Sequence, residues 1–286
     1  MTQVTHQVRL EKLERKKNIT PEELKKEHID KNCPVILTDF MTDWDATKKW
    51  NFEYLKATHG NIQVPLYSPA YSTPGKGYMQ PTCHKSLAEY IDLIQEGPTD
   101  LRMFLFNIFQ KCPEMLSEVG KPTLMTGFLK SFPFMFFGGQ GSEVKLHYDV
   151  DHSCVFLNQF EGTKKIILFA PDQSKYLYNH PYTVKSHINP LKPDFDRFPA
   201  FANAQGYECD LHPGETLFMP RIFWHYVYYT TAGFSLSLRA NPSIITQMKG
   251  VLSVAQHFIV DKGMNKLLGE RWYKLKENLA DKRAMN

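Results

Sequence analysis

Leu146-His147-Tyr148-Asp149, read together with Phe223-Trp224-His225, is the stretch around which the chain is organised. In a β-strand, residues i and i+2 lie on the same face, so His147 and Asp149 offer an imidazole and a carboxylate to one metal ion. His225 supplies a third ligand from a later strand. Two histidines and one carboxylate with open coordination positions are typical of non-haem Fe(II) centres. The sequence therefore predicts a metal site formed by these three residues.

A His-x-Asp pattern is short enough to occur by chance. His28-Ile29-Asp30 has the same spacing, but it lies in a lysine- and glutamate-rich segment that is typical of a helix. In a helix, residues i and i+2 do not share a face. The later pair instead follows a glycine-containing turn, Gly138-Gly139-Gln140-Gly141, and precedes a series of predicted strands. This setting favours a metal role for the later pair.

The composition is that of an ordinary globular protein. Of 286 residues, 42% are hydrophobic and 13% are aromatic, so the chain can bury a substantial core. The net charge of +4 is too small to indicate nucleic-acid binding. Five widely spaced cysteines without a CxxC motif indicate reduced thiols and argue against a zinc-ribbon site. With no apolar leader segment and no run of about 18 apolar residues, we expect a cytoplasmic protein that does not span a membrane.

Alternating and apolar runs separated by turn residues predict a mainly β fold with helical additions. Short strands with turn signals between them fill residues 144–239, which favours a barrel or jelly roll. Capping motifs at Thr20-Pro21-Glu22-Glu23 and Ser86-Leu87-Ala88-Glu89 predict helix starts before the barrel. We expect an N-terminal helical segment over 1–30, a β domain over 31–241 with α/β elements at its start, and C-terminal helices over 242–286.

The predicted C-terminal helix carries an amphipathic stripe. Its apolar residues fall three and four positions apart, at Met264, Leu268, Trp272, Leu275 and Leu279. Such a stripe must be buried, either against the barrel or against a second copy of the chain.

Four motifs in order give the chain a specific resemblance to a known family. They are Phe137-Gly138-Gly139-Gln140-Gly141-Ser142, then Leu146 to Asp149, then Gln159-Phe160-Glu161-Gly162-Thr163-Lys164 continuing to Asp172, and then Pro213-Gly214-Glu215-Thr216 continuing to Pro220 with Trp224-His225. Over roughly residues 30–240 the chain resembles the JmjC or cupin-like branch of the Fe(II)/2-oxoglutarate-dependent oxygenases. Within that branch it is most similar to asparaginyl hydroxylases of the factor-inhibiting-HIF type.

The resemblance implies a double-stranded β-helix, or jelly roll, of the cupin and JmjC type in which the three predicted ligands bind Fe(II). It also implies 2-oxoglutarate as co-substrate and O2 as oxidant. The family places a lysine where Lys164 stands, to pair with the far carboxylate of 2-oxoglutarate. Lys164 and Lys165 are adjacent on a strand and point to opposite faces. Only one of them can reach inward, and we expect it to be Lys164.

The chain departs from the family pattern after the second predicted ligand. Two extra residues between Asp149 and Gly162 predict a bulge over 150–154. Such a bulge moves Ser153 into or out of the site, and we include Ser153 among the expected co-substrate contacts.

A second departure concerns the groups around the lysine. Val144 and Phe104 stand where the family has a threonine and a tyrosine, and neither can hydrogen-bond a carboxylate. Arg239 stands where the subgroup has an asparagine. Its guanidinium offers a bidentate fork for the co-substrate carboxylate, with a surface salt bridge as the alternative role.

Together these features predict an Fe(II)- and 2-oxoglutarate-dependent hydroxylase that acts on a protein or peptide side chain. The fold hosts many chemistries, so a small-molecule substrate is the main enzymatic alternative. A second alternative is a non-catalytic cupin that binds a metal and a ligand as a recognition module. Lysine demethylation is less expected, because no histone-reader module is evident. From the subgroup and the apolar stripe we expect a homodimer formed through the C-terminal helices.

Overall fold

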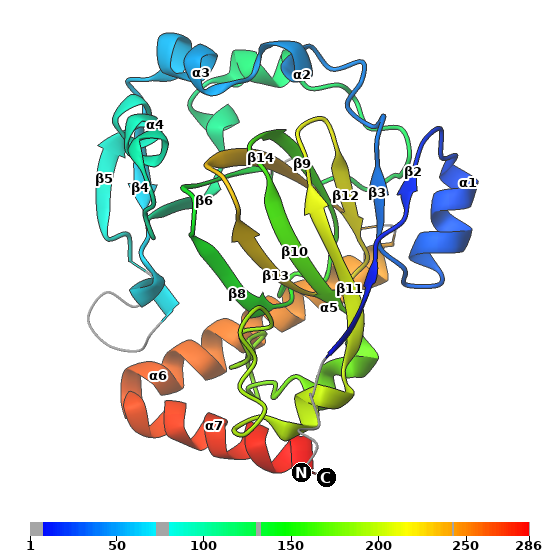
Figure 1. The fold of residues 1–286 in the computed structure, drawn as a ribbon, viewed down its shortest axis with the longest axis vertical. Coiled ribbons are helices and arrows are strands. Elements are labelled where there is room, and N and C mark those ends of the chain that lie inside the picture. Colours follow the sequence, from blue (N-terminus) through cyan, green and yellow to red (C-terminus); the bar gives the residue numbers. More distant parts are fainter. Residues whose placement is uncertain (1–7, 73–79, 130–132, 242, 286) are drawn as a thin grey trace, which may run out of the picture.

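In a computed structural model, two facing β-sheets lie at the centre of the protein and helices surround them (Figure 1). The structure describes residues 8–72, 80–129, 133–241 and 243–285. One sheet has the strand order β1 (Arg9–Lys12), β11 (Gln205–Leu211), β10 (Lys164–Phe169), β13 (Trp224–Tyr229), β8 (Glu143–His147). The other has the order β2 (Arg15–Lys16), β3 (Val35–Leu37), β12 (Thr216–Met219), β9 (Cys154–Glu161), β14 (Gly233–Ala240), β7 (Phe134–Gly138), β6 (Arg102–Phe106). A small separate sheet pairs β4 (Gln63–Leu66) with β5 (Cys83–Ser86).

Apolar side chains from both of the large sheets fill part of the space between them. Val155 and Leu157 of β9 belong to the same buried cluster as Ile166 and Leu168 of β10 and Val227 of β13. Strand β9 lies between β12 and β14, and β10 lies between β11 and β13, antiparallel to both neighbours in each case. Neighbouring strands are thus mostly not consecutive in the chain, which is typical of a jelly roll. The predicted mainly β fold with a double-stranded β-helix is confirmed.

Helices and insertions cover the outer faces of both sheets. Against the seven-stranded sheet lie α2 (Asp45–Lys49), α3 (Phe52–His59), α4 (Leu87–Glu96), η3 (Ile108–Gln110) and η4 (Pro113–Glu118). Near β3 are α1 (Pro21–Glu23) and the π-helix η1 (Leu24–Ile29), and η2 (Pro69–Ser72) follows β4. The segment between β10 and β11, with η5 (Pro171–Tyr176) and η6 (Pro199–Asn203), covers the five-stranded sheet. Each sheet is therefore buried on both faces over much of its area.

The N-terminal segment is less helical than its sequence predicts. Residues 1–7 lie outside the described part of the chain. Strand β1 pairs in parallel with β11, and β2 pairs in parallel with β3, so only Pro21–Ile29 is helical. That helix begins as predicted, with the Thr20 side chain accepting a hydrogen bond from the N–H of Glu23. The two strands cover sheet edges that would otherwise be open, and they bury Leu13 in the core between the sheets.

The C-terminal helices form a layer beneath the barrel in the view of Figure 1. They are α5 (Ile244–Gln256), the π-helix η7 (His257–Lys262), α6 (Gly263–Leu268) and α7 (Glu270–Met285). The predicted apolar stripe is only partly buried, because Leu268 and Leu275 are 44% and 46% exposed whereas Trp272 is 7% exposed. The buried face is set by Asp261, which accepts hydrogen bonds from Trp272 Nε1 at 3.0 Å and Lys276 Nζ at 2.5 Å. Among the helices that the structure describes, none has the length and apolar character needed to cross a membrane.

Gly162 turns the chain between β9 and β10 with a φ of +72°, a left-handed conformation that favours glycine. A Cβ atom there would lie 2.1 Å from the carbonyl oxygen of Ala232. We expect Gly162→Ala to lower the free energy of unfolding by more than about 2 kcal/mol. Gly141→Ala is the matched control, because Gly141 has a φ of +85° but open space around it, so it should lose only about 1 kcal/mol. Urea unfolding measures both, and equal losses would contradict the steric argument.

Candidate metal centre

Strand pairing brings the two predicted histidine ligands together. His147 ends β8, His225 lies in β13, and the two residues are directly paired in the antiparallel ladder. Their ring centroids are 4.2 Å apart. Asp149 lies two residues beyond the end of β8, with its Oδ1 3.9 Å from Nε2 of His147. One ligand atom from each of the three residues lies within 4.8 Å of the others, so the predicted ligands form one cluster.

Backbone carbonyl groups orient both imidazoles. Nδ1 of His147 lies 2.8 Å from the carbonyl oxygen of Lys145, and Nδ1 of His225 lies 3.0 Å from that of Phe223. A proton on Nδ1 satisfies each of these contacts and leaves Nε2 as the metal-binding atom. Burial and the neighbouring His225 lower the pKa of His147 to about 3, so its imidazole is neutral at physiological pH. Neutral imidazoles with oriented lone pairs are the form that binds a metal ion.

Asp149 is held by a buried guanidinium. Arg239 Nη2 lies 3.0 Å from Asp149 Oδ2, and Arg239 Nη1 donates to Asp151 Oδ1 at 2.8 Å. Burial alone would raise the pKa of Asp149, but Arg239 and the two imidazoles lower it well below its usual range. Burial likewise opposes the charge on Arg239, yet the two carboxylates raise the pKa of the guanidinium. Asp149 is therefore ionised, with Oδ2 on Arg239 and Oδ1 toward His147.

The predicted bulge after the second ligand takes the form of a turn. The N–H of His152 donates to the carbonyl of Asp149 at 3.3 Å, and His152 has a φ of +54°. The turn buries Ser153 and places it with Asp149 and His225 in the wall of a small pocket whose other lining residues are apolar. Ser153 Oγ donates to Asp151 Oδ2 at 2.9 Å and lies 3.3 Å from Arg239 Nη1. Ser153 and Arg239 are both predicted to contact a co-substrate. In the structure, both side chains donate hydrogen bonds to Asp151 in this turn.

Lys164 points into the barrel and Lys165 points out. The side chain of Lys164 is 1% exposed, and its Nζ donates to Ser235 Oγ at 2.5 Å. The same ammonium lies 4.6 Å from the ring centroid of Tyr229. Lys165 forms an ion pair with Glu208 at 2.8 Å on the outer face. Within the described residues no carboxylate lies at ion-pair distance from Lys164, and burial lowers its pKa to about 7.

The side chains of Val144 and Phe104, which stand where the family has a threonine and a tyrosine, cannot hydrogen-bond Lys164. Val144 packs against the apolar core between the sheets. The ring of Phe104 lies 4.5 Å from that of Tyr67, and the guanidinium of Arg102 lies 5.1 Å above it. The sequence reading missed Ser235, the hydroxyl group that takes over one contact with the lysine.

An alternation along β14 could have found that serine. Ser235, Ser237 and Arg239 lie two residues apart, and so share one face of the strand. That face carries Ser235 on Lys164 and Arg239 on the metal-ligand candidate Asp149. Ser237 Oγ and Arg239 Nε are buried and lack a hydrogen-bond partner within the described residues. These two buried polar atoms are therefore available to hydrogen-bond a ligand on the inner face of β14.

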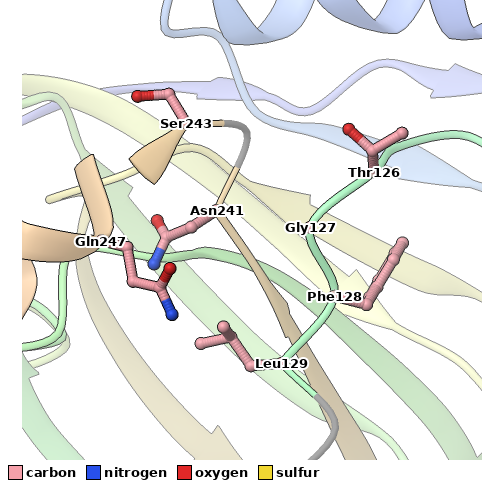
Figure 2. Close-up of a pocket in the computed structure, with 7 residues that line it drawn as sticks. All are labelled: Thr126, Gly127, Phe128, Leu129, Asn241, Ser243 and Gln247. Atoms are coloured by element: carbon pink, nitrogen blue, oxygen red, sulfur yellow. The ribbon is translucent and has the colours of Figure 1, made fainter. Parts of the chain in front are cut away.

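An open pocket lies just beyond the end of β14, where Asn241 follows the strand (Figure 2). The pocket has a volume of about 320 Å³ and is lined by Thr126, Gly127, Phe128, Leu129, Asn241, Ser243 and Gln247. Asn241 is 7% exposed, and its Oδ1 lacks a hydrogen-bond partner within the described residues. The backbone N–H of Asn241 donates to the carbonyl of Gly127 at 3.0 Å, which fixes the backbone of Asn241 at the pocket wall. A polar side chain is thus available to a ligand at this end of the strand.

Comparisons with known proteins agree with this architecture. A family model described as "Cupin-like domain" matches residues 21–241. The chain is 28% identical over 212 residues to "Lysine-specific demethylase 8" of Xenopus tropicalis, covering 71% of this chain and 47% of the relative. It is 28% identical over 237 residues to "HSPB1-associated protein 1" of Homo sapiens, covering 74% and 48%. It is 26% identical over 240 residues to "JmjC domain-containing protein D" of Dictyostelium discoideum, covering 75% and 53%.

The chain spans about half the length of these curated relatives. None of the three carries a name that specifies asparaginyl hydroxylation, so that subgroup stays a prediction. The family model covers the barrel strands from β3 to β14, together with all three clustered ligand candidates and Lys164. The protein therefore belongs to the cupin-like domain family.

Proposed function

We propose that the protein is an Fe(II)- and 2-oxoglutarate-dependent oxygenase that hydroxylates a side chain of a protein or peptide. The observation that carries the proposal is the cluster of His147, Asp149 and His225 inside a barrel that also buries Lys164. The donor set suits iron, because two imidazoles and one carboxylate leave coordination positions for other ligands. Bound there, Fe(II) would activate O2, with 2-oxoglutarate as the reductant that leaves as succinate and CO2.

The contacts that hold the three candidate ligands from behind support a metal role. Arg239 holds the carboxylate of Asp149 through Oδ2, so Oδ1 stays available as a single-oxygen ligand. The carbonyl groups behind His147 and His225 hold both rings in place. Such outer contacts orient ligands and typically change metal affinity by about 10- to 100-fold when they are removed. On this basis Arg239 is a positioning residue for Asp149, and the co-substrate carboxylate falls to Lys164.

Lys164 supplies the counter-charge for an anion inside the barrel. A buried ammonium without a carboxylate partner is costly, and a bound carboxylate would offset that cost. Ser235 stands beside the ammonium and offers a hydroxyl group to the same anion. A dicarboxylate with one end on Lys164 and the other toward the triad fits this arrangement, which supports 2-oxoglutarate as the co-substrate.

The choice of a polypeptide substrate is supported by the pocket at the end of β14 and by one set of relatives. Carboxamides such as those of Asn241 and Gln247 both donate and accept, which suits contacts with a peptide backbone. Three of the relatives are named lysine-specific demethylases, from Xenopus tropicalis, Danio rerio and Arabidopsis thaliana, and those names specify lysine. Demethylation is the second candidate, because it begins with hydroxylation of an N-methyl group at the same kind of centre.

His225→Ala should reduce succinate formation from 2-oxoglutarate by at least about 100-fold, because the metal loses one of its protein ligands. Purified protein with Fe(II), 2-oxoglutarate and O2 is the assay. Asp30→Ala is the matched control, since it removes the carboxylate of the other His-x-Asp pair, and it should retain full activity. Succinate formation that survives His225→Ala would refute the assignment. Wild-type protein that forms no succinate with any peptide pool would favour a recognition module.

Mass spectrometry of the product separates the remaining alternatives. A peptide that gains one oxygen supports hydroxylation of a side chain, and a methylated lysine peptide that loses a methyl group supports demethylation. Turnover restricted to small molecules would overturn the choice of a polypeptide substrate.

The affinity for 2-oxoglutarate should depend on the protonation of Lys164. Because burial lowers its pKa to about 7, the ammonium of the unliganded protein loses its proton as the pH rises through that value. The unfolded chain keeps the usual lysine pKa of 10.5, so between these two values the folded state binds fewer protons and stability rises with pH. Above pH 7, binding of 2-oxoglutarate should therefore take up a proton and weaken by up to about tenfold per pH unit.

Lys164→Met should raise the Kd for 2-oxoglutarate at least about tenfold below pH 7 and abolish its pH dependence. Lys165→Met is the matched control, because that side chain points outward to Glu208, and it should leave both quantities unchanged. Titration calorimetry in buffers of different ionisation enthalpy measures affinity and proton uptake together. An unchanged Kd in Lys164→Met would move the co-substrate carboxylate to another group.

We also propose that the protein is a homodimer formed through the C-terminal helices. Large apolar side chains are exposed along α5 and α6, at Ile245 (69%), Met248 (61%), Val251 (64%), Leu252 (67%) and Leu267 (78%). Exposed apolar patches of this kind are typical of interfaces. Leu267→Glu should shift the molar mass from dimer to monomer in light scattering, and Lys266→Glu should not. A wild-type monomer would contradict the proposal.

A further inference from the structure

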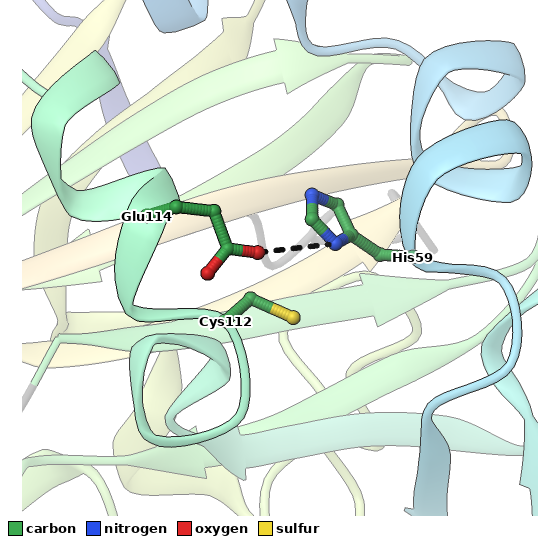
Figure 3. A group of neighbouring side chains, drawn as sticks. All are labelled: His59, Cys112 and Glu114. Carbon is green, nitrogen blue, oxygen red and sulfur yellow. Dashed lines mark ion pairs between the residues drawn. The ribbon is translucent and has the colours of Figure 1, made fainter.

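A second cluster of metal-ligating side chains lies in the helical layer outside the seven-stranded sheet. Figure 3 shows His59, at the end of α3, facing Cys112 and Glu114, which flank the start of η4. One ligand atom from each residue lies within 4.8 Å of the others, and His59 Nδ1 is 3.8 Å from Glu114 Oε1. The side chain of His59 is 9% exposed, Cys112 is 6% exposed and Glu114 is 66% exposed. The cluster is thus buried on the imidazole and thiol side and open to solvent on the carboxylate side.

The fold fixes both segments that contribute to the cluster. Helix α3 is anchored in the core by Phe52 and Leu55, and η4 is anchored by Met115. Glu118, at the end of η4, accepts hydrogen bonds from Trp50 Nε1 at 2.6 Å and Tyr54 Oη at 3.1 Å. These contacts hold η4 against the segment that leads into His59. The three donors are therefore brought together by the packing of α3 and η4 on the core, in which Cys112 itself takes part.

We propose that His59, Cys112 and Glu114 form a second metal site, which binds a zinc-class divalent cation with water as the fourth ligand. A thiolate, an imidazole and a carboxylate are the ligands that Zn²⁺ takes in proteins. The spacing of this cluster matches that of the first one, where His147 Nε2 lies 3.9 Å from Asp149 Oδ1. The two donor sets differ, since only the second cluster contains a thiol group. A thiolate favours zinc over the harder cations that oxygen ligands suit.

Binding at this site is an exchange of a proton for the cation. Zinc binds the thiolate form of cysteine, so Cys112 gives up its thiol proton when the cation binds. One proton is therefore released for each cation bound. Metal bonds would then join α3 to η4. Without the metal, the contact between the His59 imidazole and the Glu114 carboxylate contributes little to stability by itself.

Cobalt(II) tests the site, because it replaces zinc and gives a thiolate-to-metal charge-transfer absorption that imidazole and carboxylate ligands do not give. The full chain, stripped with a chelator and titrated without O2, should bind about two Co(II) ions and show this near-ultraviolet band. Cys112→Ser should abolish the band and remove about one bound ion. His225→Ala should also remove one ion but keep the band. Added Zn²⁺ should displace the band.

Two further variants guard against a folding defect in Cys112→Ser. Glu114→Gln changes an exposed side chain, so it should fold normally and weaken the band-forming site by at least about tenfold. Cys33→Ser removes a half-buried thiol outside the cluster and should leave the band unchanged. A single bound ion that carries the band would support this site while failing the first centre. Absence of the band in the wild-type protein, or a band unaffected by both Cys112→Ser and Glu114→Gln, would overturn the proposal.

Discussion

The antiparallel pairing of β8 with β13 is the constraint on which the first site depends. Its register sets His147 directly opposite His225. The register shifts after His225, and β13 then continues to Tyr229, which pairs with Lys164 of β10. Each imidazole is then fixed by a carbonyl group two residues away in its own chain segment. A slip of one residue in this pairing would turn one ring to the opposite face and separate the donors.

Polar side chains on the inner face of β14 contact both Lys164 and the metal-ligand candidate Asp149. One end of this polar row contacts Lys164 through Ser235, and the other holds Asp149 through Arg239. Arg239 also pairs with Asp151, so one buried guanidinium faces two carboxylates and the cluster keeps a negative charge. Buried charge that is not fully compensated is costly, and a divalent cation at the triad offsets it. Asn241, two residues beyond Arg239, lines the open pocket at the end of β14.

Alternation and turn residues were sufficient to predict a barrel or jelly roll and to place His147 and Asp149 on one strand face. The double-stranded β-helix and the convergence of His225 with that pair came from the family resemblance. Alternation also showed that Lys164 and Lys165 point to opposite faces, and the family resemblance selected Lys164 as the inward one. None of these signals predicted that Arg239 pairs with Asp149, because that contact depends on a turn that folds Asp151 and Ser153 back onto the same guanidinium. The buried ion pair of Asp261 in the C-terminal helices, and the strands before Pro21, likewise depend on packing between segments that are distant in sequence.

We propose that His147, Asp149 and His225 hold a ferrous ion with coordination positions left for 2-oxoglutarate. Anaerobic titration of the purified protein with Fe(II) and 2-oxoglutarate, followed by visible absorption, tests it most directly. Chelation of iron by the keto acid gives a metal-to-ligand charge-transfer band, and we expect this band only when both are present and the three ligand residues are intact. A wild-type protein without the band, or a band that persists in His147→Ala, would contradict it.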